Sequence, residues 1–312
     1  MAYFLAIDVG GTKIAIGVGD ESGAFRGIRT LATHPSWAKE AAIANIYEAA
    51  LELLSEVHVD LTECRRVGLG TPGPLDGTRL LESSNLVAWK GLDWRAELEA
   101  KFHIPVAVAN DATAAGLAEW QFGAARGTRD AIYVTVSTGI GAGIIAGGAL
   151  YGGARGNAGE FGHIIMQPEG PLCHAGHRGC LESLASGTAI RRMGQERQEQ
   201  SEYLKVLATV DTKDVFDGYI RGDEVCVDIV HGAADRLGLG LSYLVDLFNP
   251  EKIVLGGGVA THAPASYRQR VAAAMARWAL PSLASIVTVV PAELGEDSGI
   301  KGALALAITQ TP

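Results

Sequence analysis

Short apolar runs alternate with longer segments of helical periodicity along the chain, and this alternation predicts an α/β fold. The first two apolar runs, residues 3–9 and 14–19, flank a pair of glycines and predict a β-hairpin. Apolar residues recur at helical spacing in residues 37–57 and in the long segment Glu224–Phe248. The same reasoning predicts strands at 66–70, 104–109, 132–136 and 253–255, and helices at 112–122 and 300–308.

The opening hairpin pattern recurs near the middle of the chain. Residues 132–136 and the apolar run after them flank a turn at Thr138-Gly139-Ile140-Gly141, about 130 residues after the first turn. Residues 131–154 carry no charge and are long enough for a membrane span, but their glycines and β-branched residues favour two buried strands. The repeat predicts two related lobes, each beginning with a tight glycine turn.

Length, charge and cysteine content narrow the functional classes. A chain of 312 residues is long enough for two lobes, and its net charge of -9, with no basic block, argues against nucleic-acid binding. No basic segment precedes the first apolar run, so no secretion peptide is expected. The four cysteines do not form the framework of a disulfide-rich secreted domain. These observations predict a cytoplasmic protein without nucleic-acid or membrane partners.

The first turn, Asp8-Val9-Gly10-Gly11-Thr12-Lys13, carries groups suited to a phosphate. Gly10 and Gly11 let backbone N–H groups approach a phosphate closely, Thr12 adds a hydroxyl and Lys13 a positive charge. Asp8, at the strand end, is placed to hold Mg²⁺ through water, because magnesium keeps much of its hydration shell. Taken alone, the segment is explained equally well by a hairpin turn that needs its glycines.

The second glycine turn favours a phosphate site over a plain hairpin turn. One turn from each lobe, with Thr138 and Gly139 in the second, would hold the phosphates of a nucleotide from both sides. A further run, Gly256-Gly257-Gly258, follows the strand predicted at 253–255, although a glycine run by itself is usually a simple turn. The Walker A pattern is absent, so the chain is not expected to be a P-loop enzyme.

Five short motifs occur in order: Asp8-Val9-Gly10-Gly11-Thr12-Lys13, Gly70-Thr71-Pro72-Gly73-Pro74, Asn110-Asp111-Ala112, Glu160-Phe161-Gly162-His163 and Gly179-Cys180-Leu181-Glu182. Together they resemble the ROK family, whose name covers repressors, open reading frames and kinases. The resemblance implies an actin-like (ribonuclease H-like) two-lobed sugar kinase fold with duplicated lobes and a central cleft. It also implies ATP, Mg²⁺ and a hexose or N-acetylhexosamine as ligands. The expected lobes are residues 1–112 with 299–312, and residues 113–298.

Asp111 is the expected general base. A sugar hydroxyl attacks phosphorus better when a carboxylate accepts its proton and orients its lone pair. Asn110 and Asp111 follow a predicted strand and should emerge at its carboxyl end, where ligands bind in α/β proteins. A carboxylate that only caps a helix is the simpler interpretation of the residues alone, and the resemblance favours the base.

The resemblance also implies a set of sugar ligands. Vicinal hydroxyls need paired donors and acceptors, which Glu and His side chains supply compactly. A plain turn explains Asn85 nearly as well, and Gly73 would bring its backbone close to the sugar. The Gly256-Gly257-Gly258 run resembles the adenosine-side loop of the family. The expected sugar-binding residues are Gly73, Asn85, Asn110, Asp111, Glu160, His163 and Glu182.

A structural zinc site is a further implication of the resemblance. The family pattern Cys-x-Cys-Gly-x-x-Gly-Cys, with an upstream His, corresponds here to His163 and to residues 173–180, but Ala175 stands where the middle cysteine would be. A structural zinc takes four ligands. The expected ligands are His163, Cys173, Cys180 and His177, with His174 as an alternative to His177. A site that has lost its metal is the competing interpretation.

The expected activity is ATP-dependent phosphorylation of O6 of glucose, by resemblance to the glucokinase branch. Kinases for N-acetylglucosamine, N-acetylmannosamine or fructose are alternatives; glucose is preferred because no extra aromatic residue adjoins Asn85, Glu160 or His163 to hold an acetamido group. A sugar-sensing regulator is disfavoured because no helix-turn-helix precedes Asp8, and a non-catalytic relic because Asp111 is present. The family also implies a homodimer or homotetramer.

Overall fold

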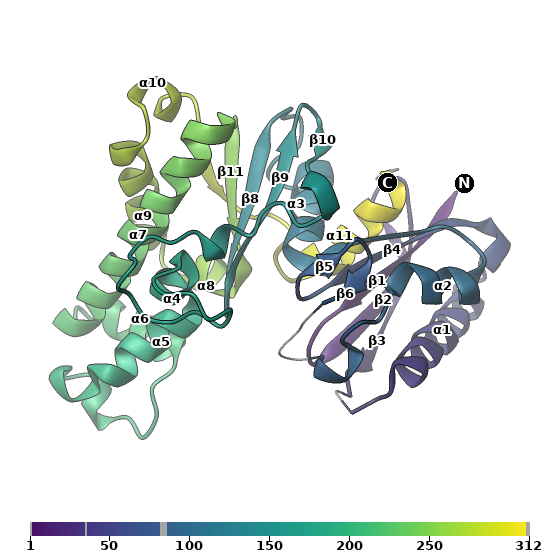
Figure 1. Ribbon diagram of the computed structural model, residues 1–312, viewed down its shortest axis with the longest axis horizontal. Helices are drawn as coiled ribbons and strands as arrows, with labels where there is room; N and C mark the ends of the chain where they lie inside the picture. Colours follow the sequence, from purple (N-terminus) through teal and green to yellow (C-terminus); the bar gives the residue numbers. More distant parts are fainter. Residues whose placement is uncertain (1, 35, 82–85, 310–312) are drawn as a thin grey trace.

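The computed structural model describes residues 2–34, 36–81 and 86–309, and it has two halves that are each built on a five-stranded mixed sheet (Figure 1). The strand order is β3-β2-β1-β4-β7 in the first sheet and β10-β9-β8-β11-β12 in the second. In each sheet two antiparallel pairings are followed by two parallel ones. The repeated hairpin of the sequence is therefore the start of a repeated sheet.

The first sheet brings three strand ends to one edge. Its parallel strands β1, β4 and β7 place Asp8 beside Gly70, and Gly70 beside Ala109. Asp8 and the residues that follow β7 therefore lie on either side of β4, at the carboxyl edge where α/β proteins bind ligands. The strands are β1 (Tyr3–Val9), β2 (Lys13–Asp20), β3 (Phe25–Ala32), β4 (Cys64–Thr71) and β7 (Val106–Asn110).

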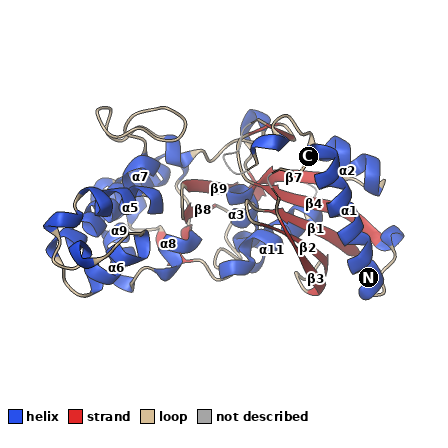
Figure 2. Cartoon of the chain, turned by 90° about the horizontal axis from the view of Figure 1, so that it is seen from below, coloured by secondary structure: helices blue, strands red, loops and turns tan. Residues whose placement is uncertain are grey.

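Helices cover both faces of the first sheet (Figure 2). On one face, α1 (Lys39–Glu56) and α2 (Trp94–Phe102) enclose an apolar core that includes Trp89 and Trp94. On the other face, α11 (Ser298–Ile308) packs against β1 and β4. The contact is so close that a Cβ on Gly68 would collide with the backbone of α11, which explains the glycine there.

The second sheet is packed against a mainly helical layer whose centre is α7. Its strands are β8 (Ala131–Val136), β9 (Ile140–Ala146), β10 (Ala149–Leu150), β11 (Lys252–Gly256) and β12 (Thr288–Pro291). The helices are α4 (Leu181–Ala185), α5 (Gly187–Glu196), α6 (Thr212–Ile220), α7 (Glu224–Phe248), α8 (Gly257–His262), α9 (Ala265–Trp278) and α10 (Pro281–Ala284).

The chain passes between the halves through α3 (Asp111–Phe122) and again through residues 292–297, and α3 packs on β8, β9 and α11. Glu119 of α3 is buried, and its carboxylate accepts hydrogen bonds from the backbone N–H groups of Ala124, Glu293 and Leu294 at 2.8–3.2 Å. One carboxylate therefore joins both connections, and hydrogen bonds to a buried charge are among the stronger ones in proteins.

Short elements complete the described chain. The pair β5 (Leu75–Asp76) and β6 (Arg79–Leu80) forms a small separate sheet. The 3₁₀ turns are η1 (Leu61–Glu63), η2 (Val87–Trp89), η3 (Gly153–Arg155), η4 (Phe161–His163), η5 (Gln198–Gln200), η6 (Leu204–Val206) and η7 (Gly295–Asp297).

The predicted strands and helices are all present, within a few residues of their expected bounds, and two glycine segments differ from expectation. The second turn ends at Gly139, because Ile140 already pairs with Val136 as the first residue of β9. Gly257 and Gly258 begin helix α8 rather than forming a loop. The charge-free segment at 131–154 forms strands as expected, and among the described residues no helix combines the length and apolarity of a membrane span.

Candidate active site

Two carboxylates lie at the carboxyl edge of the first sheet. Asp8 is the penultimate residue of β1, and Asp111 is the first residue of α3, directly after β7. Asn110 caps that helix by accepting a hydrogen bond from the Ala112 N–H at 2.9 Å. The capping role considered for Asp111 therefore falls to Asn110, although the same N–H also lies 2.8 Å from Asp111 Oδ1. Asp111 is exposed, so its carboxylate is accessible to a ligand.

Both carboxylates have a raised pKa. Loss of hydration to the surrounding protein raises the pKa of Asp111 to about 6; the hydrogen bond from the Ala112 N–H opposes the rise, and the neighbouring charges of Asp8 and Glu160 add to it. Loss of hydration also raises the pKa of Asp8 to about 6, and the charge of Lys13 opposes the rise. A carboxylate with a pKa near 6 is a stronger base than an ordinary aspartate and is still ionised at neutral pH.

Thr33, the residue that follows β3, supports the first glycine turn. The Gly10 N–H donates to the Lys13 carbonyl at 2.9 Å, and the hydroxyl of Thr33 donates to the Gly10 carbonyl at 2.8 Å. Thr12 and Lys13 are exposed at the tip. The turn is fixed while its hydroxyl and its ammonium group stay accessible, which is the arrangement that a phosphate site requires.

Glu182 supports the second glycine turn. Its Oε2 accepts a hydrogen bond from the Ile140 N–H at 3.1 Å and occupies the space that a side chain at position 139 would need. Its Oε1 lies 2.5 Å from His174 Nδ1. In this arrangement Glu182 contacts the second turn and the loop at 173–180 at once, so its carboxylate connects the segment expected at the nucleotide with the loop expected to hold zinc.

The remaining expected sugar ligands lie on two segments. Asn110 Nδ2 donates to the Gly73 carbonyl at 3.3 Å, which joins two of them in the first half. Glu160 precedes η4 and His163 ends it, with 3.9 Å between the Glu160 carboxylate and His163 Nε2. The negative charge of Glu160 in the second half contributes to the raised pKa of Asp111 in the first. Asn85 lies outside the described residues.

Three of the expected zinc ligands come together. The donor atoms of His163, Cys173 and Cys180 all lie within 4.8 Å of one another, and His163 Nδ1 is 3.8 Å from Cys173 Sγ. Two buried thiols and an imidazole at these separations fit three corners of a tetrahedral zinc site. The structure does not bring His177 to this group: its side chain is exposed, and His174 instead forms a second group with His163 and Glu182.

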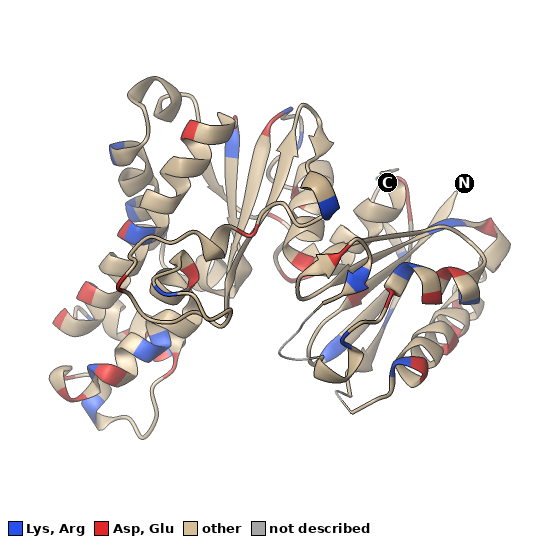
Figure 3. Cartoon of the chain, in the orientation of Figure 1, with Lys and Arg blue, Asp and Glu red and all other residues tan. Residues whose placement is uncertain are grey.

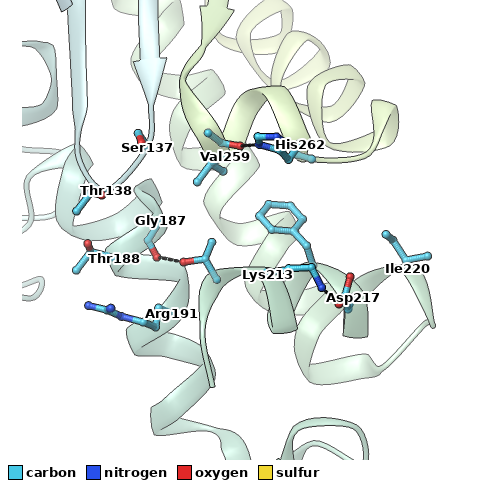
Figure 4. A pocket seen from close by; sticks show the side chains of 14 residues that line it. Ser137, Thr138, Gly187, Thr188, Arg191, Lys213, Asp217, Ile220, Val259 and His262 are labelled. Carbon is cyan, nitrogen blue, oxygen red and sulfur yellow. Dashed lines mark hydrogen bonds and ion pairs between the residues drawn. The ribbon is translucent and has the colours of Figure 1, made fainter. Parts of the chain in front are cut away.

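A cavity of about 580 Å³ opens in the second half beside the second glycine turn (Figure 4). Two of the expected nucleotide-binding residues, Thr138 and Gly258, line it. Gly139, Gly256 and Gly257 do not line it; side chains at Gly256 and Gly257 would collide with Tyr133 and Thr135 of β8. The other lining residues are Ser137, Gly187, Thr188, Arg191, Thr212, Lys213, Phe216, Asp217, Ile220, Val259, His262 and Ala263.

Most of these cavity residues were not predicted from the sequence. Arg191 of α5 and Lys213 of α6 are among them; the Lys213 ammonium group pairs with Asp217 at 2.9 Å, and the Thr212 hydroxyl donates to the Gly187 carbonyl at 2.8 Å (Figure 4). These residues form no motif, because helices that are distant in the sequence assemble the wall. Over the described chain, the positions of Lys and Arg are interspersed with those of Asp and Glu along both halves (Figure 3).

Comparison with known proteins assigns this combination of fold and site to a class. A solved ROK hexokinase from Thermus thermophilus superposes with a TM-score of 0.87 at 37% identity, covering 98% of this chain and 97% of that one. A ROK glucokinase from Streptomyces griseus, solved with glucose and AMPPNP, gives a TM-score of 0.76 at 32% identity over 97% and 98% of the two chains. The fold is the actin-like fold, and the protein is a sugar kinase.

The family follows from the whole length of the chain. The model of the ROK family matches residues 4–310, and the chain belongs to that family. Among curated proteins, a glucokinase from Thermotoga maritima is 33% identical, over 97% of this chain and 96% of its own length. An N-acetylmannosamine kinase from Yersinia pestis is 34% identical, over 97% of both. The resemblance of the five sequence motifs is thereby confirmed at the level of the family and the fold.

Proposed function

We propose that this protein is an ATP-dependent hexokinase that phosphorylates O6 of glucose, with Asp111 as the general base. The observation that carries the proposal is the position of Asp111. Its exposed carboxylate, with a pKa of about 6, directly follows β7 at the carboxyl edge of the first sheet, the edge that also carries Asp8, and the charges of Asp8 and Glu160 both help to raise that pKa. A base is needed at the meeting point of a phosphoryl donor and an acceptor hydroxyl.

The proposed reaction is a single phosphoryl transfer. Ionised Asp111 accepts the proton of the sugar hydroxyl as its oxygen forms a bond to the γ-phosphorus, and the bond from phosphorus to the β-phosphate oxygen breaks, which releases ADP. Lys13 neutralises phosphate charge from one side of the transferred group, and the Thr12 hydroxyl donates a hydrogen bond to the phosphate there. Mg²⁺, when bound, supplies further charge neutralisation, and Asp8 would hold it through water.

The nucleotide is proposed to occupy the cavity beside the second turn. Its wall offers apolar contact from Phe216 and Val259 for a base, and hydroxyls from Thr138 and Thr188 for polar groups. The phosphates would extend from there toward the first turn at Gly10 and Gly11. The similar glucokinase from Streptomyces griseus was solved with the ATP analogue AMPPNP, which supports this choice of phosphoryl donor.

Glucose is the proposed sugar, held by Gly73, Asn110, Glu160, His163 and Glu182, with Asn85 kept as a further candidate ligand. Curated relatives named glucokinase support this choice. The similarity to N-acetylmannosamine kinases makes an acetylated hexosamine the second candidate.

A screen of ADP release with glucose, mannose, fructose, N-acetylglucosamine and N-acetylmannosamine tests the proposed substrate. We expect kcat/KM for glucose to exceed that for either acetylated sugar by at least about tenfold, which corresponds to roughly 1.4 kcal/mol of transition-state free energy. A preference for an acetylated sugar would replace glucose in the proposal and leave the kinase mechanism in place. ADP release with none of the five sugars would contradict the proposed function itself.

We further propose that zinc binds to His163, Cys173 and Cys180. These residues fit three of its four positions, and Ala175 and the exposed His177 leave the fourth position to His174 or to water. The metal would hold His163 in the orientation that the sugar site needs. The proposal also includes closure of two lobes, which are residues 1–112 with 299–312 and residues 113–298. It further includes assembly as a homodimer or homotetramer and a cytoplasmic location.

A further inference from the structure

The side chain of Asn157 joins the two halves of the molecule. The Leu75 N–H donates to Asn157 Oδ1 at 3.1 Å, and Asn157 Nδ2 donates to the Leu75 carbonyl. The two residues are 82 positions apart in the sequence. A primary amide that bonds both the N–H and the C=O of one residue replaces a partner strand, because it offers a donor and an acceptor in the same plane.

Leu75 is firmly part of the first half. Its side chain is buried in the core beneath α1 and α2, and its backbone pairs with Leu80 in the β5–β6 sheet, which lies along the border facing the second half (Figure 1). Two residues earlier, the Gly73 carbonyl accepts the hydrogen bond from Asn110, the residue before Asp111. A bond to Leu75 therefore reaches the same structural unit that carries the proposed base.

Asn157 is firmly part of the second half. It lies three residues before Glu160, in the loop that leads to His163. Gly159 fixes this loop on β9: its carbonyl accepts a hydrogen bond from the Ala142 N–H at 2.9 Å, and a Cβ at this position would collide with the Ala142 carbonyl. A bond from Asn157 therefore acts on the segment that carries two of the proposed sugar ligands.

An ion pair accompanies this amide contact. Arg155 lies 3.0 Å from Asp76, so the residues next to Leu75 and near Asn157 also meet across the border. Both side chains are largely exposed, and an exposed pair of this kind contributes little. The ion pair provides a matched control on the same two segments.

We infer that Asn157 is a positioning residue that holds the halves at the spacing at which Asp111 and Glu160 face the same sugar. The inference rests on the proposed function. Without the amide, more of the ligand-free protein would be open, and sugar binding would have to close it. The apparent dissociation constant for sugar equals the intrinsic constant divided by the closed fraction, so it rises as that fraction becomes smaller. Turnover at saturating sugar is preserved, because bound sugar keeps the protein closed. At saturating sugar the protein is closed with or without the amide, so the KM for ATP measured under that condition should not change, although the phosphates extend from the cavity in the second half to the first turn.

Steady-state kinetics of Asn157→Ala test whether the amide contact affects the binding of sugar but not turnover or the KM for ATP. We expect the KM for glucose to rise about three- to thirtyfold, the range that one or two net hydrogen bonds supply, with kcat and the KM for ATP within about twofold of wild type. Asn157→Asp should behave similarly, because an ionised carboxylate cannot donate to the Leu75 carbonyl and repels it. Arg155→Ala should stay within about twofold in all three constants. An unchanged KM for glucose in Asn157→Ala would overturn the inference, as would an equal rise in Arg155→Ala.

A measurement without catalysis separates this inference from the proposed function. Small-angle scattering of the ligand-free chain should give a larger radius of gyration for Asn157→Ala than for wild type, and added glucose should remove the difference. Equal radii for the two ligand-free proteins would overturn the role of Asn157. If no hexose is phosphorylated, the proposed function fails, and the scattering of the ligand-free proteins still decides whether Asn157 holds the halves together.

Discussion

The two sheets have the same strand order and pairing, yet they carry different side chains at corresponding positions. In the first sheet Asp8 of β1 lies beside Gly70 of β4, and in the second Thr135 of β8 lies beside Gly256 of β11. At the position where the first sheet has the Asp8 carboxylate with its raised pKa, the second sheet thus has the neutral hydroxyl of Thr135. The repeated backbone determines where strand ends meet, and single side chains decide what chemistry occurs there.

The glycine turns differ in the same way. Thr33 supports the first turn from behind and leaves Lys13 exposed, whereas Glu182 and the N-terminus of α5 lie against the second. The first turn can present positive charge to a phosphate, and the second forms part of the wall of a largely neutral cavity. In the proposed function, the first half therefore supplies the reactive groups and the second half supplies most of the binding surface.

Removal of the proposed base should have the largest effect. Asp111→Asn keeps the size of the side chain but removes the proton acceptor, so we expect kcat to fall by roughly 10²–10⁴ while the dissociation constants for glucose and for the ATP analogue change little. Rapid-quench assays and calorimetry measure the two quantities. A variant within threefold of wild-type turnover would show that Asp111 is not the base.

Loss of a zinc ligand should affect binding and stability in the second half. The wild-type protein should contain about one zinc per chain by elemental analysis, and Cys180→Ser should lower both the metal content and the melting temperature. His174→Ala and His177→Ala, compared in a chelator competition, show which histidine completes the site. Metal-free wild-type protein with full activity and the same melting temperature would refute the zinc proposal.

A side chain placed in the cavity should affect nucleotide binding alone. Gly258 has open space around it, because a Cβ at this position would lie 3.8 Å from Ser137 Oγ, so Gly258→Leu should fill the cavity without disturbing the fold. We expect the KM for ATP to rise by about tenfold or more, because a bulky group excludes the ligand from a packed site. Gly258→Ala is the matched control and should stay within about threefold. An unchanged KM for ATP in Gly258→Leu would place the nucleotide elsewhere.

The elements that the sequence predicted best are those with strong local patterns. The expected helix Glu224–Phe248 has the bounds of α7, and the first hairpin is present as expected, because apolar periodicity and glycine turns act over a few residues. Strand β3 was missed although its burial alternates along its length, and α5 and α6 were missed because they are short.

The candidate site was only partly predictable for the same reason. Motif residues such as Asp8 and Asp111 lie at strand ends, which a strand prediction locates directly. The wall of the cavity, the hydrogen bond between His174 and Glu182, and the amide contact of Asn157 depend on segments that meet through tertiary packing. No local pattern in a single sequence encodes such contacts, so they become apparent only in the folded chain.

The pH dependence of kcat in wild type and in Asp111→Asn tests the role of Asp111 most directly. Asp111 must be ionised to accept a proton, and its surroundings raise its pKa above that of an ordinary aspartate, so wild-type kcat should fall at low pH, by close to tenfold per pH unit below the pKa of Asp111 in the substrate complex. Saturating Mg²⁺ and ATP should keep Asp8 ionised, because a bound cation lowers the pKa of a nearby carboxylate. We predict that the residual kcat of Asp111→Asn is nearly constant between about pH 5 and 7.5 under the same conditions. A residual kcat that keeps the wild-type fall at low pH would contradict the assignment of Asp111 as the base.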